Sequence, residues 1–226
     1  MNCIKCNREI PEDSVFCPFC GGKVAAACSA CGAELIDDSE FCRFCGAKVE
    51  EGAVPATPAD KFEWSVLKNG TVSIDEYNRG EKKVVIPSII SGRRVSRISS
   101  DSFAGEPLVS ITIPESVETI DCWAFSFCKA LSSVNIYNGV KIIDEFAFCD
   151  CKSLTSINLP DSVTKIGQGA FKGCASLESI TFSENLTEIG KHTFKGCTSL
   201  TSINLHDSVK IGKNAFKGTP LEDNFK

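Results

Sequence analysis

The residues best suited to chemistry are fourteen cysteines, which fall into two sets. Eight stand before residue 46 as pairs separated by two residues, and the other six lie between Cys122 and Cys197. A CxxC turn places two thiolates on one side of a tight knuckle, and two facing knuckles form the tetrahedral sulfur site that Zn²⁺ prefers. The first set therefore predicts bound metal, whereas the second needs a separate explanation.

The eight N-terminal cysteines form two modules of identical spacing, each with two CxxC pairs separated by ten residues. An offset of 25 also superposes Phe16 on Phe41 and Gly21 on Gly46, so the unit is duplicated. Duplication favours two separate sites over one interleaved site. We assign one ion to Cys3, Cys6, Cys17 and Cys20, and a second ion to Cys28, Cys31, Cys42 and Cys45.

Both ions are expected to be structural Zn²⁺. Four thiolates fill a tetrahedral site and leave no open position at which water is activated. A module of about 25 residues buries too little apolar surface to fold alone, so metal binding should supply on the order of 10 kcal/mol or more per site. Iron in a rubredoxin-like site uses the same ligands and is the alternative metal. Metal removal is expected to unfold residues 1–50.

This arrangement resembles the double zinc ribbon family, whose members carry tandem CxxC-x10-CxxC ribbons, over residues 1–50. The resemblance implies two ribbons, at 1–25 and 26–50, that serve nucleic-acid, protein or purely structural roles. The segment has five basic and eight acidic residues, and each filled site adds about two negative charges. A nucleic-acid-binding ribbon would show the reverse balance, so the charge disfavours nucleic acid as a partner.

An internal repeat contains the second cysteine set. A phenylalanine recurs at 103, 125, 148, 171, 194 and 216, at intervals of 22 or 23 residues. A period of this length predicts a solenoid, in which each coil buries its apolar side chains against the next coil. Three apolar columns accompany the phenylalanine, represented by Leu154, Ile157 and Leu159. We predict about six coils stacked at about 4.8 Å.

The repeat unit, L-x-x-I-x-L-P-x-x-V-x-x-I-G-x-x-A-F-x-x-C, resembles the leucine-rich repeats of the BspA-like bacterial family. The resemblance covers Val84 to Leu221. It implies a curved solenoid with a parallel sheet on its concave face, short helical turns near the Ala-Phe positions, and a role in protein or host-surface interaction. The expected fold class is therefore mainly β, with two zinc ribbons followed by a leucine-rich-repeat solenoid.

Two further segments complete the expected domain organisation. Residues 51–60 are rich in small residues and contain two prolines, which predicts an extended linker. Residues 61–83 contain two alternating stretches around Asn69-Gly70, which predict a β-hairpin with a primed turn. This hairpin looks like the N-terminal cap of the BspA-like family. The solenoid is expected at 84–226.

Side chains alternate along a strand, so the residues that flank the central isoleucine of each L-x-x-I-x-L segment point away from the core. They form two polar rows on the predicted concave face. Such a face suits a peptide or protein partner, and it is equally the ordinary solvated face of a parallel sheet. One row is Ser110, Ser133, Ser156, Ser179 and Ser202, and the other is Thr112, Asn135, Asn158, Thr181 and Asn204.

The second cysteine set has a structural explanation. Four of its members recur every 23 residues and should form a buried ladder, because free cysteine is a small apolar filler. These are Cys128, Cys151, Cys174 and Cys197. Cys122 and Cys149 lie off the ladder and are expected to be more exposed.

No catalytic residue is predicted. The two histidines are His192, in a stretch expected to be exposed, and His206, and neither has a recurrent carboxylate partner. The sequence contains no GxxxxGK[ST] phosphate loop. The chain is therefore not expected to be an enzyme.

Composition bounds the remaining possibilities. A net charge of −5 and a pI near 5.2 supply no general attraction for nucleic acid or anionic lipid. The first residues lack the pattern of a secretion signal, and no apolar run approaches the roughly 20 residues that span a bilayer, so we expect a cytoplasmic protein, monomeric by default. The favoured function is a scaffold for protein–protein interaction. The alternatives are zinc-ribbon-mediated binding to nucleic acid or the transcription machinery, and a bacterial surface adhesin.

Overall fold

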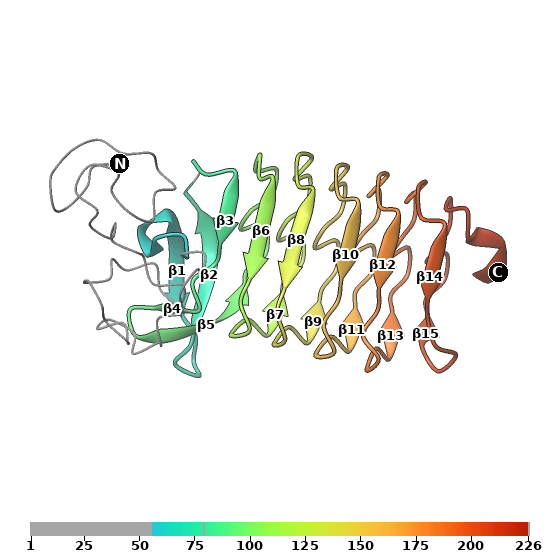
Figure 1. Cartoon of the computed structure of the whole chain (residues 1–226). Helices are drawn as coiled ribbons and strands as arrows, with labels where there is room; N and C mark the ends of the chain where they lie inside the picture. The colour runs from blue at the N-terminus through green and yellow to red at the C-terminus, as the bar shows by residue number, and fades with distance from the viewer. Residues whose placement is uncertain (1–55, 79, 226) are drawn as a thin grey trace, which may run out of the picture.

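The computed structural model describes residues 56–78 and 80–225. The eight predicted zinc ligands, and the first half of the predicted linker, lie outside these residues. The described chain forms a stack of coils that starts at a hairpin and ends at a short 3-10 turn (Figure 1).

A capping hairpin begins the stack. The 3-10 turn η1 (Ala59–Lys61) leads into β1 (Phe62–Val66), which pairs antiparallel with β2 (Val72–Tyr77). The hairpin is confirmed, but the predicted primed turn is wrong. A primed turn of type I′ needs positive φ at both central residues, whereas within this loop positive φ is confined to Gly70, at 81°.

Side-chain hydrogen bonding explains the difference. The Asn69 side chain accepts hydrogen bonds from the backbone N–H of Thr71 (3.1 Å) and from its hydroxyl (2.7 Å). Gly70 N–H donates to the Leu67 carbonyl (2.9 Å), and Leu67 N–H donates to the Thr71 carbonyl (2.8 Å). These bonds close a longer loop in which only the glycine takes the left-handed conformation.

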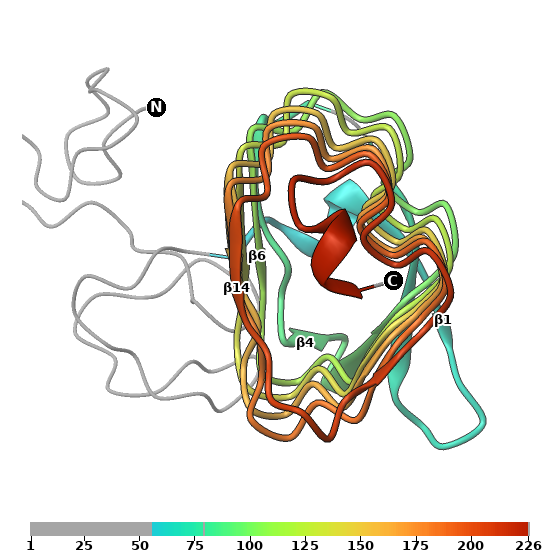
Figure 2. The same ribbon diagram turned by 90° about the vertical axis from the view of Figure 1, so that its right-hand side faces the viewer.

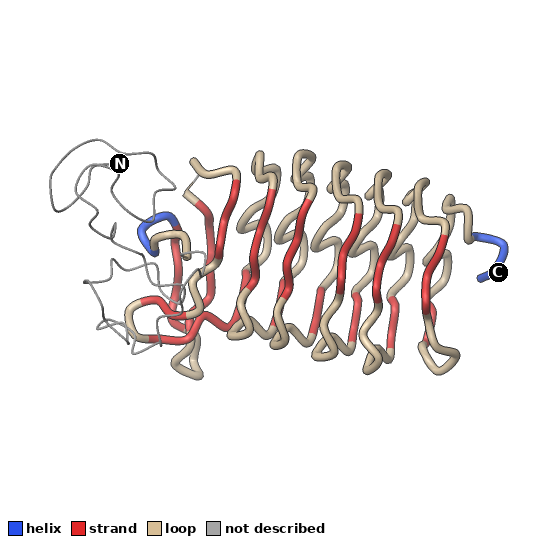
Figure 3. The backbone as a smooth tube through the Cα atoms, in the orientation of Figure 1, coloured by secondary structure: helices blue, strands red, loops and turns tan. Residues whose placement is uncertain are grey.

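Two lines of strands run along the stack, and Figure 3 shows them in red. We call the first the long sheet, with strand order β1-β2-β5-β7-β9-β11-β13-β15, and β4 (Ile89–Ile90) pairs with its β5. From β2 onward its neighbouring strands are parallel. Its remaining strands are β5 (Arg93–Ile98), β7 (Thr119–Ile120), β9 (Ile142–Ile143), β11 (Lys165–Ile166), β13 (Glu188–Ile189) and β15 (Lys210–Ile211).

The second line, which we call the front ladder, contains two three-stranded parallel sheets. One sheet contains β3 (Lys83–Val85), β6 (Ser110–Ile113) and β8 (Ser133–Ile136). The other contains β10 (Ser156–Asn158), β12 (Ser179–Thr181) and β14 (Ser202–Asn204). Within the described chain, β8 and β10 lie side by side without strand pairing (Figure 1). The parallel solenoid predicted from the repeat period is therefore confirmed.

The repeated phenylalanines form one continuous stack inside the coils. Successive ring centroids from Phe103 to Phe216 lie 4.9, 5.1, 5.4, 5.6 and 5.3 Å apart, and the rings are within 23° of parallel. All six rings are at most 2% exposed. The stack supplies the shared core that no single coil contains.

Aromatic rings also close the stack at both ends. Tyr77 of the hairpin stacks on Phe103 at 5.3 Å. At the other end, Phe225 of η2 (Glu222–Phe225) stacks on Phe216 at 4.3 Å, beside the buried Leu221. Figure 2 shows this C-terminal turn lying across the end of the coils.

The short helical turns expected near the Ala-Phe positions are hydrogen-bonded turns. Ala124 N–H donates to the Asp121 carbonyl (3.3 Å), and Cys128 N–H donates to the Phe125 carbonyl (3.4 Å). Bonds between coils then continue the stack, since Phe125 N–H donates to the Ala147 carbonyl of the next coil at 2.8 Å. The turns are thus as tightly joined as the strands.

Candidate interaction surfaces

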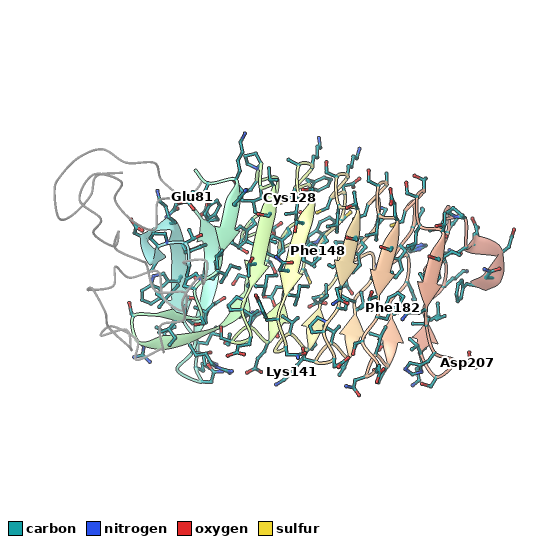
Figure 4. All side chains as sticks on the ribbon, in the orientation of Figure 1. Glu81, Cys128, Lys141, Phe148, Phe182 and Asp207 are labelled. Carbon is teal, nitrogen blue, oxygen red and sulfur yellow. The ribbon has the colours of Figure 1, made fainter. Side chains whose placement is uncertain are left out.

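The cysteine ladder is a packing feature. Cys128, Cys151, Cys174 and Cys197 are fully buried, as predicted. Each thiol donates a hydrogen bond to the backbone carbonyl of the stacked phenylalanine in the preceding coil. Cys174, for example, donates to the Phe148 carbonyl at 3.1 Å. Burial raises the pKa of Cys128 and of Cys197 to about 12, so these thiols stay protonated at neutral pH. Figure 4 places Cys128 and Phe148 among the side chains of the coils.

The two cysteines off the ladder differ from each other. Cys122 is half-buried, in line with the prediction. Cys149 is only 3% exposed, so the prediction that it would be more accessible is wrong. The reason is side-chain length, because Lys172 and Lys195 at the equivalent position reach solvent whereas a cysteine does not extend beyond its turn. Burial also raises the pKa of the Cys149 thiol to about 12.

The cysteines and histidines of the described residues are not grouped as metal ligands. No group of three or more His, Cys, Asp or Glu side chains in residues 56–78 and 80–225 is arranged to hold a metal ion. His206 Nε2 lies 3.2 Å from the Glu184 carbonyl, which only accepts, so Nε2 is the donor. Nδ1 then accepts from the Ser208 hydroxyl at 2.7 Å. Both ring nitrogens therefore take part in local turn structure.

The predicted polar rows are aligned as expected. The strand register sets Ser110 beside Ser133, and it sets Ser179 between Ser156 and Ser202. The second row is aligned in the same way, with Thr181 between Asn158 and Asn204. Eight of the ten side chains are exposed, and Ser110 and Thr112 are half-buried. We call these ten residues the serine–asparagine face.

A shallow depression lies where the strands of this face end, across the junction between β8 and β10. It has a volume of about 430 Å³. Three of the ten predicted residues line it, namely Asn158, Thr181 and Asn204. The other lining residues are Ile136, Tyr137, Asn138, Leu159, Pro160, Asp161, Phe182 and Glu184. A neighbouring hollow of about 300 Å³ shares Phe182, Glu184 and Asn204.

Sequence reasoning missed the residues that distinguish this depression. Tyr137 is 59% exposed, and with Asn138 it replaces the Pro-Asp pair that stands at Pro160-Asp161 in the next coil. That break in the repeat was the available signal. Acidic side chains border the same ends of the strands, since one exposed carboxylate occupies the turn after each of β6, β10, β12 and β14. They are Glu115, Asp161, Glu184 and Asp207.

A second surface lies on the turns around the phenylalanine stack. We define the turn edge by the phenylalanine stack. For each stacked phenylalanine from Phe125 to Phe216, it comprises the residues from three positions before the ring to two positions after it. Three of its aromatic residues have left-handed backbones, Trp123 (φ 63°), Phe127 (φ 59°) and Phe146 (φ 55°). For a bulky residue this conformation costs about 1–2 kcal/mol. In the following coil the equivalent residues are glycines, Gly169 and Gly173, which adopt it freely.

The three aromatic rings form a partly exposed group. Trp123 stacks on Phe146 at 4.3 Å and lies 6.4 Å from Phe127, and Phe127 is 45% exposed. Stacking offsets part of the backbone strain, since an aromatic pair contributes about 0.5–1.5 kcal/mol. Glycine would remove the strain altogether, so the coil geometry does not require these aromatic residues.

Two family models match the chain. The model described as BspA type leucine rich repeat region matches six copies over residues 96–222. The model described as double zinc ribbon matches residues 3–46, which include all eight predicted zinc ligands. Zinc fits this donor set, because each module offers four thiolates at tetrahedral-site spacing. None of the helices in the described part is long and apolar enough to cross a membrane.

Solved structures show the same architecture. A T. pallidum leucine-rich-repeat protein is 30% identical, with a TM-score of 0.60 over 72% of this chain and 88% of that one. A leucine-rich cell surface protein from Faecalibacterium prausnitzii is 33% identical, with a TM-score of 0.66 over 73% of this chain and 46% of its own length. No curated protein matches the chain. The chain belongs to the BspA-type leucine-rich-repeat family and carries a double zinc ribbon ahead of its repeats.

Proposed function

We propose that the chain is a non-enzymatic protein-interaction module that binds an extended segment of a partner protein across the serine–asparagine face. The observation that carries this proposal is the depression of about 430 Å³, which is lined by Asn158, Thr181 and Asn204 together with the exposed Tyr137. Amide and hydroxyl groups pair with a peptide backbone, and an exposed aromatic ring supplies apolar contact area at low entropic cost. Neither matched family is a family of enzymes.

The charge of the surroundings indicates which segments bind best. Carboxylates of Asp161 and Glu184 line the depression, so segments with Lys or Arg are favoured over acidic ones. In this proposal the ribbons hold two structural Zn²⁺ ions and serve to position the solenoid or to add a second contact. Their charge makes nucleic acid a poor partner.

Peptide display on the full zinc-loaded chain tests the proposal. Selection from a random library should enrich basic peptides, and the double variant Asn158→Ala/Asn204→Ala should weaken their binding about tenfold, which is about 1.4 kcal/mol. Thr198→Ala is the control, because Thr198 is also exposed but belongs to a turn away from the depression. Failure to enrich any sequence, or equal binding by the double variant, would rule out this face as the peptide site.

Location in the cell distinguishes the scaffold from a surface adhesin. We propose a cytoplasmic location, since eight zinc-binding thiolates and the six free cysteines of the described chain suit a reducing compartment. The competing candidate is favoured by one observation, the similarity to a protein named as a cell surface protein. Fractionation of the native cells with an antibody against the chain decides between them, because an adhesin would be recovered at the cell surface.

A further inference from the structure

The turn edge changes its chemical character along the stack. All of the side chains that show this change are exposed or half-buried. The coils of Phe125 and Phe148 present Trp123, Phe127, Glu145, Phe146 and Asp150. The coils of Phe194 and Phe216 present Lys191, His192, Lys195, Lys213 and Lys217, and the Phe171 coil between the two pairs of coils presents Lys172. One end of the edge is therefore aromatic and acidic, and the other end is basic.

The basic residues lie on adjoining coils, because Gly173 N–H donates to the Lys195 carbonyl and Gly196 N–H donates to the Lys217 carbonyl, each at 2.9 Å. In agreement, the pKa of His192 is lowered, first by burial and then by the positive charges of Lys195, Lys172, Lys217 and Lys191. His192 Nδ1 is buried and has no hydrogen-bond partner within the described residues. Gathering five lysines on one edge raises their mutual repulsion, which a partner carrying carboxylates would relieve.

The Phe171 coil, which lies between the two ends, carries two glycines on the turn edge. A Cβ atom added to Gly169 would lie 2.4 Å from Cε1 of Phe146, so the Phe146 ring lies over this glycine. A Cβ atom added to Gly173 would lie 2.6 Å from Oδ1 of Asp150. Side chains of the acidic end therefore lean across the Phe171 coil, from which mainly Gln168 and Lys172 project. The two glycines thus make room for the Phe146 ring and the Asp150 carboxylate at the centre of the edge.

We propose that the turn edge is a self-complementary surface through which two copies of this chain pair in antiparallel orientation. A two-fold axis at the Phe171 coil sets the Phe148 coil against the Phe194 coil of the second copy. It likewise sets the Phe125 coil against the Phe216 coil. A parallel arrangement would instead bring like charges together, so the charge order selects the antiparallel one.

The repeat register then defines the contacts. A two-fold axis in the plane of the interface makes equivalent positions of the coils face each other. Glu145 faces Lys191 of the second copy, and Phe146 faces His192. Phe127 lies near Lys217 of the second copy, within reach of a cation–π contact. The strained aromatic residues are thus retained for an interface and not for the fold.

The expected dimer is weak. Five coils at about 4.8 Å give an edge about 20–25 Å long, which falls in the small, transient class of interface, with a dissociation constant on the order of 100 µM. Lys172 meets Lys172 of the second copy at the axis, which lowers the affinity further. Lys129 and Lys152 follow the buried Cys128 and Cys151 in sequence, outside the residues that define the turn edge. This proposal replaces the expectation of a monomer, and it uses none of the residues of the serine–asparagine face.

Sedimentation equilibrium of the full zinc-loaded chain, from about 10 µM to about 1 mM, tests the proposal around the expected dissociation constant. The wild-type chain should dimerise, and raising NaCl to about 0.5 M should weaken the dimer because the charges are exposed. Glu145→Lys and Lys191→Glu should each weaken it about tenfold or more. Lys68→Glu in the cap loop and Glu178→Lys ahead of β12 are exposed controls with matched charge changes and should leave it unaltered.

Mixing the two edge variants gives the decisive result. In the mixed dimer the lysine introduced by Glu145→Lys meets the glutamate introduced by Lys191→Glu, and the native pair remains at the second contact, so association should be restored. Lys172→Gln should tighten the dimer, because it removes the repulsion at the axis. A chain that stays monomeric throughout the concentration range overturns the proposal. So does a dimer that neither edge variant weakens, because that dimer would use another surface.

Discussion

The phenylalanine stack and the turn edge occupy the same coils but follow opposite rules. In the stack, the same residue recurs in every coil, and the rings lie within 5.6 Å of their neighbours. On the turn edge, the position two before the phenylalanine changes from Trp123 to Phe146, Gly169, His192 and Asn214. The buried column repeats because every coil needs the same ring for stacking. The turn-edge column varies from coil to coil, so stacking does not fix its residues, and there the chain tolerates backbone strain.

Metal removal compares the duplicated cysteine modules with the solenoid. It is expected to have the largest effect on folding. Chelation should remove two Zn²⁺ ions per chain and unfold residues 1–50, at a cost on the order of 10 kcal/mol per site, while the solenoid stays folded. Elemental analysis and circular dichroism before and after chelation measure both quantities. A metal-free segment that stays folded would contradict the zinc assignment.

Within the solenoid, the strongest contrast is between Phe148 and Phe127. Phe148→Ala should lower the free energy of unfolding by about 3–5 kcal/mol, because it opens a cavity in the middle of the stack. Phe127→Gly should change it by less than about 1 kcal/mol, since relief of left-handed strain offsets the lost contacts. Denaturant titration of the two variants measures the difference. Equal losses would remove the distinction between the two regions.

The contact between Phe146 and Gly169 gives a smaller effect that tests the edge geometry. Gly169→Ala should cost about 1–2 kcal/mol from the left-handed backbone alone, plus the displacement of the Phe146 ring. In the background of Phe146→Ala the ring is gone, so the same substitution should cost only the backbone strain. A double-mutant cycle that shows no coupling would mean that the ring does not rest on this glycine.

The smallest expected effect is the pH dependence contributed by His192. Its pKa is lowered in the folded chain, so the unfolded state, with a pKa near 6.5, binds the proton more tightly. The resulting stability is present above about pH 6.5 and is lost as the pH falls through the folded-state pKa. His192→Asn, which copies Asn214 of the next coil, should reduce the dependence of unfolding free energy on pH in this window. If the difference in unfolding free energy between the wild-type chain and His192→Asn does not change with pH in this window, the lysine cluster around His192 is contradicted.

The features that were predictable from sequence are those that repeat. The period of the phenylalanine column gave the parallel coils, and the cysteine spacing gave the buried ladder. The Gly70 loop was not predictable, because it is closed by hydrogen bonds that Thr71 donates to the Asn69 side chain. Cys149 is buried because its side chain is shorter than those of the lysines at the equivalent position and does not reach solvent.

The candidate site was predictable only in part, for a physical reason. The rows of serine and asparagine follow from strand alternation, and the structure aligns them. The depression begins where β8 and β10 lie side by side without pairing, and Tyr137, which interrupts the repeat, lines it. The turn edge was not predicted, because its distinguishing feature is a left-handed backbone at bulky residues such as Trp123. The residue type alone does not indicate that conformation.

A saturation scan of the full chain, read out as resistance to protease, tests most directly the claim that the buried phenylalanine column carries the fold and the varying column of the turn edge does not. The account predicts that Phe125, Phe148, Phe171 and Phe194 tolerate almost no substitution. It predicts that Trp123, Phe127 and Phe146 accept many residues, with glycine as good as the native residue or better. If these three positions prove as intolerant as the stack, the aromatic edge belongs to the fold, and the account is contradicted.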